Sequence, residues 1–140
     1  MKGFTLIEIL LALAILMLLL GITVPVGWNF FTSSAVQSER DTLISLITRA
    51  RTYAITNKNS APHGIAISAP SFTLFQGASY AARAAQFDEP FPRTNSVTIT
   101  GPSELVVTPL SGDTTPGTFT LSLGTTSRTV SINSEGMMEY

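Results

Sequence analysis

The sequence predicts an α+β fold in which one long amino-terminal helix packs against a small antiparallel β-sheet domain. Two observations indicate this fold. An apolar run is followed directly by an amphipathic stretch with helical spacing, and the rest of the chain consists of short alternating segments separated by turns rich in glycine and proline. With some 25 of the 140 residues in the apolar run, the remainder is enough for one small domain.

The helix begins with an apolar run that is long enough to cross a membrane. No Asp, Glu, Lys or Arg occurs from Ile9 to Ser38. A hydrocarbon core of about 30 Å needs roughly 20 helical residues, and Phe4 to Val26 supplies that length. We therefore expect residues 4–28 to form a transmembrane half of the helix. A kink is expected at Gly21 and Pro25, because proline has no amide proton to donate and glycine disfavours helix.

Two features separate this run from a secretory signal peptide. The run ends without the small-residue cleavage site that such signals carry, so the helix is expected to be retained. The second feature is Glu8, a carboxylate at the start of the run. Burial of such a group at the bilayer centre costs about 2.5–3.5 kcal/mol on insertion scales, so Glu8 is expected to have a partner.

The residues Gly3-Phe4-Thr5-Leu6-Ile7-Glu8 follow a very short basic leader and precede the apolar run. This arrangement resembles the processing motif of type IV pilins and type II secretion pseudopilins. The resemblance implies a leader at residues 1–3, cleavage by a prepilin peptidase between Gly3 and Phe4, and methylation of the new amine of Phe4. It also implies that Glu8 is required for assembly, and Pro25 falls where the family commonly has a helix proline. The kink there is either functional or merely tolerated in a membrane helix.

Electrostatics gives Glu8 a physical role in such a filament. A carboxylate and the amine of Phe4 each lack a sufficient partner in lipid, and the carboxylate of one subunit can pair with the amine of a neighbour. The alternative is that Glu8 is a tolerated end charge at the headgroup level. The partners implied are the prepilin peptidase, sister pilins or pseudopilins in a helical filament, and an inner-membrane assembly platform driven by a separate ATPase.

Lys2 predicts the orientation, because positive charge favours the cytoplasmic side. The amino terminus is then cytoplasmic, and the globular part lies outside the inner membrane and later in a periplasmic or extracellular filament. The aromatic residues Trp28, Phe30 and Phe31 either anchor at the outer interface or pack between subunits. The alternative function is a permanently anchored binding module that does not polymerise.

Residues 29–58 are expected to form the amphipathic half of the helix. Apolar residues recur at spacings of three and four, while Glu39 and Asp41 are among the residues assigned to the polar face. The segment Asn57–Pro62 is expected to end the helix. The apolar positions are Leu43, Ile44, Leu46, Ile47, Ala50, Ala54 and Ile55.

Residues 59–140 are expected to form the β-sheet domain. An antiparallel sheet is predicted, with its apolar face on the helix. Within 78–94 we expect an alanine-rich helical turn, followed by a surface loop at Phe87–Pro92. The six candidate strands are His63–Ser68, Ser71–Gln76, Ser96–Thr100, Leu105–Thr108, Thr118–Leu123 and Thr129–Asn133.

A finer resemblance links Leu43–Asn57 and the closing Val130–Met137 to pseudopilin H and related minor pilins. It implies a minor subunit near the filament tip that helps to start assembly. Some relatives bind DNA through arginines near the carboxyl terminus, but no arginine follows Gly136 here. Once Lys2 is removed, nine acidic side chains face seven basic ones, so a nucleic-acid partner is not expected.

Catalysis and cofactors are not expected. The only histidine, His63, is interpreted as solvated or structural, and the chain has no cysteine for a disulfide or a thiol site. Asp88, Glu89 and Asp113 can in principle meet at a calcium ion, but they lack ligand spacing. No phosphate-binding loop occurs, so any ATP-driven step belongs to partners.

Overall fold

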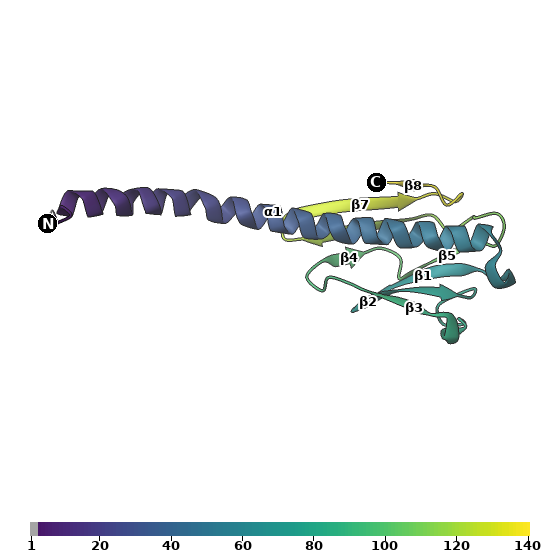
Figure 1. Cartoon of the computed structure of the whole chain (residues 1–140). Helices are drawn as coiled ribbons and strands as arrows, with labels where there is room; N and C mark the ends of the chain where they lie inside the picture. Colours follow the sequence, from purple (N-terminus) through teal and green to yellow (C-terminus); the bar gives the residue numbers. More distant parts are fainter. Residues whose placement is uncertain (1–2) are drawn as a thin grey trace.

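A computed structural model describes residues 3–140, without the side chains of 21–27 and 29. It consists of the helix α1 (Leu6–Ile55), eight short strands and two 3₁₀ turns, η1 (Lys58–Ser60) and η2 (Ala85–Phe87). Figure 1 shows that the amino-terminal part of α1 projects alone, whereas its carboxyl-terminal half lies along the strands. The predicted α+β architecture, a long helix packed against a small antiparallel β domain, is confirmed.

Helix α1 ends where the sequence predicts. Thr56 caps the helix, and Asn57 takes left-handed geometry with φ 51° and ψ 39°. Asparagine tolerates this conformation better than most residues, which makes it a common helix terminator. The kink expected at Gly21 and Pro25 lies outside the residues whose side chains are described.

The strands form two four-stranded antiparallel sheets instead of the single sheet that we predicted. The first has the order β3 (Glu89–Pro92), β2 (Ser71–Gln76), β1 (His63–Ser68), β5 (Glu104–Val107). The second has the order β4 (Thr98–Thr100), β6 (Gly117–Leu123), β7 (Thr126–Ile132), β8 (Met138–Glu139). From β3 to β6 the chain alternates between the two sheets. Each sheet packs against α1, the first mainly through β1 and the second through β6 and β7.

The prediction of a surface loop at Phe87–Pro92 is wrong, because most of this segment belongs to a strand. Residues Glu89–Pro92 form β3, in which Phe91 lies opposite Phe72 of β2. Two prolines are compatible with this strand because β3 is an edge strand, where a missing amide donor can face outward. The expected helical turn nearby is the short η2, and β8 was not predicted.

The core lies between the two sheets and the carboxyl-terminal half of α1. Most of the predicted apolar face of the helix is confirmed: Leu43, Leu46, Ile47, Ala50 and Ala54 are buried. Ile55, by contrast, is 40% exposed. The largest fully buried side chains from the strands are Phe72, Phe75, Phe119, Ile65, Leu74, Leu121, Val107 and Val130.

Glu39 does not lie on the polar face as predicted, since it is only 4% exposed. The Arg93 Nε donates to its Oε1 at 3.3 Å, and the Thr94 amide donates to its Oε2 at 3.1 Å. Arg93 also donates to the Val97 carbonyl at 3.2 Å and lies 5.2 Å from the Phe72 ring centroid. A buried charge needs such compensation. The pair therefore fixes the loop before β4 to the carboxyl-terminal half of α1.

Candidate functional site

The candidate site lies on the stem, which we define as residues 3–31, the part that projects from the β domain (Figure 1). Many of its described side chains are large and apolar, and they are exposed all around the helix. An exposed apolar surface of this extent is rare on monomeric soluble proteins. These side chains are Phe4, Leu6, Ile7, Ile9, Leu10, Leu11, Leu13, Ile15, Leu16, Met17, Leu18, Leu19, Leu20, Trp28, Phe30 and Phe31.

The first turn of α1 positions Glu8. Thr5 is the N-cap, with extended geometry at φ −81° and ψ 152°. The Glu8 amide donates to the Thr5 carbonyl at 3.1 Å and approaches the Thr5 Oγ1 at 3.4 Å. An acidic residue in the first turn also complements the helix dipole. The sequence therefore starts the helix directly ahead of the carboxylate.

Glu8 lies on an apolar face of the stem. It shares a shallow groove with Phe4, Ala12, Leu13 and Leu16, which follow one another at helical spacing. In the sequence no other charged residue occurs between Gly3 and Ser38. Among the described residues Glu8 forms no ion pair. The arrangement presents one acid, next to Phe4, on an otherwise apolar surface.

The predicted processing site is accessible. Phe4 is 81% exposed, and no described residue beyond the neighbours of Gly3 in the chain lies within 4 Å of the position that a Cβ on Gly3 would take. Met1 and Lys2 lie outside the described residues. The structure therefore brings Gly3, Phe4 and Glu8 together at the free end of the stem.

Within the described part of the chain, no helix meets the length and apolarity that a membrane crossing requires.

The aromatic cluster lies where the stem meets the β domain. Trp28 and Phe31 have ring centroids 6.2 Å apart, and Phe30 is exposed beside them. Thr32, the next residue, is buried, and its Oγ1 lies 3.5 Å from the Thr126 Oγ1 of β7. The cluster thus marks the level at which α1 enters the domain.

His63 takes the structural role that the sequence suggested, but as a buried residue. It is 3% exposed, and its ring meets Tyr53 edge-on with centroids 5.5 Å apart. Its Nδ1 lies 3.0 Å from the Ala61 carbonyl oxygen. Burial lowers the pKa of His63, and the nearby Lys58 charge lowers it further against the opposing hydrogen bond to Ala61.

The three acidic residues considered for calcium form no shared site. Asp88 pairs with Arg83 at 2.7 Å, and Glu89 pairs with Arg49 at 2.7 Å. Across the residues that the structure describes, no three His, Cys, Asp or Glu side chains gather with the geometry of a metal site.

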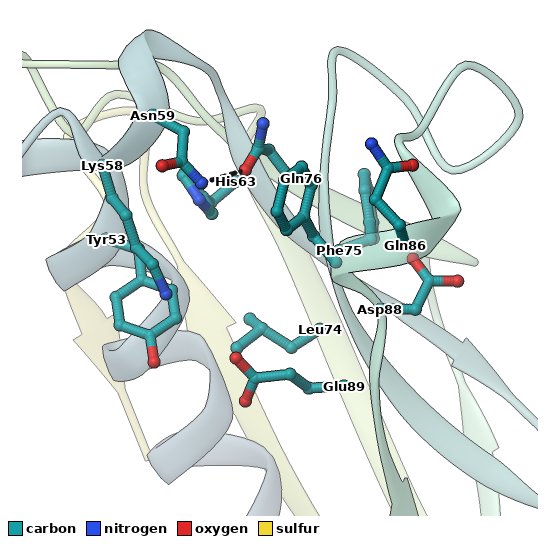
Figure 2. A pocket seen from close by; sticks show the side chains of 11 residues that line it. Tyr53, Lys58, Asn59, His63, Leu74, Phe75, Gln76, Gln86, Asp88 and Glu89 are labelled. Carbon is teal, nitrogen blue, oxygen red and sulfur yellow. Dashed lines mark hydrogen bonds between the residues drawn. The ribbon is translucent and has the colours of Figure 1, made fainter.

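A polar cavity at the other end of α1 was not predicted from the sequence. Figure 2 shows Tyr53 and Lys58 on the helix side of this cavity, with Gln86 and Asp88 across from them. The residues come from segments far apart in the chain, so no spacing signal could reveal the site.

Comparison with known proteins supports the amino-terminal motif. Residues 1–24 match the family model described as the prokaryotic N-terminal methylation motif. No curated protein and no solved structure matches the chain. The finer resemblance to pseudopilin H gains no support from these comparisons. The motif indicates a prepilin-like substrate and supports a relation to the type IV pilin family.

Proposed function

We propose that the protein is a structural subunit of a type IV pilus or a type II secretion pseudopilus. The observation that carries this proposal is the methylation motif at residues 1–24, placed at the exposed end of a helix whose other half is packed in a β domain. A chain that only folds as a domain has no need of a projecting apolar stem with one acid near its end. A subunit that packs with others through that stem needs both.

The prepilin is inserted in the inner membrane before assembly. Residues 4–28 form the membrane-embedded half of α1, with the amino terminus in the cytoplasm and the β domain outside. Support comes from the sequence alone, in which the apolar run from Phe4 to Val26 contains enough residues to cross a bilayer and Lys2 precedes it. A prepilin peptidase then cleaves after Gly3 and methylates the amine of Phe4.

Assembly uses the charge at Glu8. After cleavage the Phe4 amine is cationic, and Glu8 lies on the same face of the stem. In an apolar bundle of stems an unpaired charge is costly, so the carboxylate of one subunit pairs with the amine of the next. This pairing sets the register between subunits.

The role assigned is structural and not catalytic, and the subunit is a minor one. The minor role is supported only by the likeness of Leu43–Asn57 and Val130–Met137 to minor pilins. Because the sequence contains no phosphate-binding loop, the energy for assembly comes from a membrane platform driven by a separate ATPase.

Mass spectrometry of the amino terminus tests the proposal. The chain is expressed in a cell that contains a prepilin peptidase and is then purified from membranes. The expected mature terminus is N-methyl-phenylalanine at Phe4. The control variant Gly3→Leu is expected to retain Met1, because it disrupts the cleavage motif. An intact Met1 in the unsubstituted chain would instead favour a permanently anchored binding module.

A further inference from the structure

A groove of about 270 Å³ runs along the last two turns of α1, between the helix and the segment 136–140. Figure 1 shows β8, which belongs to this segment, beside the carboxyl-terminal half of the helix. Residues three and four positions apart lie on one face of a helix, so α1 supplies a continuous wall. Among the residues that line the groove are Arg51 and Ile55 from α1, and Met137, Met138 and Tyr140 from the opposite wall.

Most of the large apolar side chains that the β domain exposes gather at this end of α1. Leu110 lies beside the groove, because its amide donates to the Ala54 carbonyl in the last turn of the helix at 3.0 Å. Among the described residues outside the stem, Phe87 is the one large exposed apolar residue elsewhere. Exposed apolar clusters that include tyrosine, methionine and arginine are typical of surfaces that bind other proteins. The four clustered residues are Ile55, Leu110, Met137 and Tyr140.

Arg51 is a cation in this groove without an acidic partner. Its Nη2 donates to the Glu135 carbonyl at 3.2 Å, and the guanidinium forms no other hydrogen bond to a described residue. None of the ion pairs in the described part of the chain involves Arg51, and its buried Nε has no acceptor there. A guanidinium has five N–H donors, and a buried donor without an acceptor is unfavourable. An external carboxylate can therefore pair with Arg51 without displacing an acid of this chain.

The acidic residues nearest to the groove do not line it. Asp113 and Glu135 are exposed residues of loops. Glu139 alternates with Met138 and Tyr140 along the extended chain, which directs its side chain to the opposite side of β8. The negative charges at the margin disfavour a partner that carries several acids. The groove therefore favours a single carboxylate, placed at Arg51.

The walls of the groove are held in place by the rest of the β domain. The Tyr140 ring lies 5.5 Å from the guanidinium carbon of Arg40, which is a cation–π distance. The Met137 amide donates to the Asn133 Oδ1 at 2.8 Å. A surface that is ordered before a partner binds loses less conformational entropy on binding.

We propose that this groove is a docking site for an extended segment of a partner protein, in which one Asp or Glu lies between apolar residues. The carboxylate pairs with Arg51, and the apolar side chains of the partner cover Ile55, Met137 and Tyr140. Because Met137 is 57% exposed and Tyr140 is 69% exposed, the surface suits a peptide segment and not an enclosed small molecule. The proposal does not rest on the filament role, since none of these residues belongs to the stem.

Methionine methyl groups allow a direct test by NMR. The full chain, with 13C-labelled methionine methyl groups and in uncharged detergent micelles, is titrated with the peptide acetyl-Leu-Glu-Leu-amide. Met137 and Met138 report on the groove, and Met17 on the stem is the internal control for effects of the peptide on the micelle. The signals of Met137 and Met138 are expected to shift until saturation with a Kd of about 1 mM, and that of Met17 is expected to stay unchanged.

A matched peptide and two matched variants test the role of the charge. Acetyl-Leu-Gln-Leu-amide has the same size without the carboxylate and should bind at least about tenfold more weakly. Arg51→Met should weaken binding of the Glu peptide by a similar factor. Arg128→Met, which removes an exposed cation of β7, should leave its Kd unchanged.

The proposal is overturned if the Glu peptide does not shift Met137 and Met138, if the two peptides bind equally well, or if Arg51→Met binds the Glu peptide as tightly as the unsubstituted chain. The comparison of the two peptides uses the unsubstituted chain, so it decides the question even if Arg51→Met perturbs the loop at Glu135. Failure here would leave the proposed filament role standing, because mass spectrometry of the Phe4 terminus tests that role separately.

Discussion

The two halves of α1 differ in whether their apolar side chains are buried. In the carboxyl-terminal half of α1, side chains such as Leu43 and Ile47 are buried between two sheets, whereas on the stem Leu6 and Met17 are exposed. Both halves are rich in large apolar residues. Only the packed half therefore stabilises the fold, because apolar side chains lower the free energy of the folded state relative to the unfolded state only when they are buried. The stem's apolar surface stays exposed in the single chain.

The two glutamates of α1 show the same contrast. Glu39 is enclosed and paired with Arg93, whereas Glu8 is exposed and, among the described residues, has no ion-pair partner. One acid fixes a loop within the molecule. The other remains available for a partner outside it.

The largest expected effect concerns Glu8→Ala. If the stem serves association alone, this variant should fold, insert and be processed normally, yet be lost from filaments because the Phe4 amine of a neighbour has no countercharge. Immunoblots of sheared filaments and of membranes measure incorporation. Glu139→Ala, an exposed acid on β8, is the control and should incorporate normally. Normal incorporation of Glu8→Ala would remove the role assigned to that carboxylate.

Two phenylalanine substitutions compare how much the core and the stem contribute to the free energy of unfolding. Phe119 is fully buried and Phe30 is 76% exposed. Phe119→Ala should lower the free energy of unfolding by about 3–5 kcal/mol, because it leaves a cavity. Phe30→Ala should change it by no more than about 0.5 kcal/mol. Denaturant titration of the full chain in micelles, followed by circular dichroism, compares them. Equal losses would show that the stem contributes to folding.

The arginine that pairs with Glu39 gives a smaller effect. Arg93→Leu should cost about 3 kcal/mol, near the lower end for a broken buried pair, because the Thr94 amide still donates to Glu39. Arg40→Leu removes a partly buried guanidinium that pairs with the exposed Asp41 and lies over the Tyr140 ring, and it should cost about 1 kcal/mol. The same denaturant titration checks both. A loss for Arg93→Leu no greater than that for Arg40→Leu would mean that the buried pair adds little.

Local signals made much of the fold predictable. Asn57 ends α1 as expected, and β1 and β2 have the predicted bounds because Ala69-Pro70 separates two alternating segments. The positions of Gly3, Phe4 and Glu8 follow from sequence neighbourhood alone. The processing role of Gly3 and Phe4 and the assembly role of Glu8 stay predictions.

Contacts between residues far apart in the chain could not be predicted from the sequence. The prolines of β3 indicated a loop, and only the pairing of Phe91 with Phe72 across the sheet edge makes that segment a strand. Likewise, the burial of Glu39 depends on Arg93, which lies 54 positions away. Its place on the apolar stripe, three residues after Val36 and four before Leu43, was the one local hint.

The position of Tyr140 determines where a label can be attached. Strand β8 runs back along the domain, so that Tyr140 lies with its ring 5.5 Å from the guanidinium carbon of Arg40, in the carboxyl-terminal half of α1 (Figure 1). In the proposed filament, a fluorescent or affinity tag fused after Tyr140 would therefore emerge beside α1 and obstruct neighbouring subunits. The exposed segment around Ala81 offers an insertion point away from that flank, because it connects β2 and β3 of the other sheet.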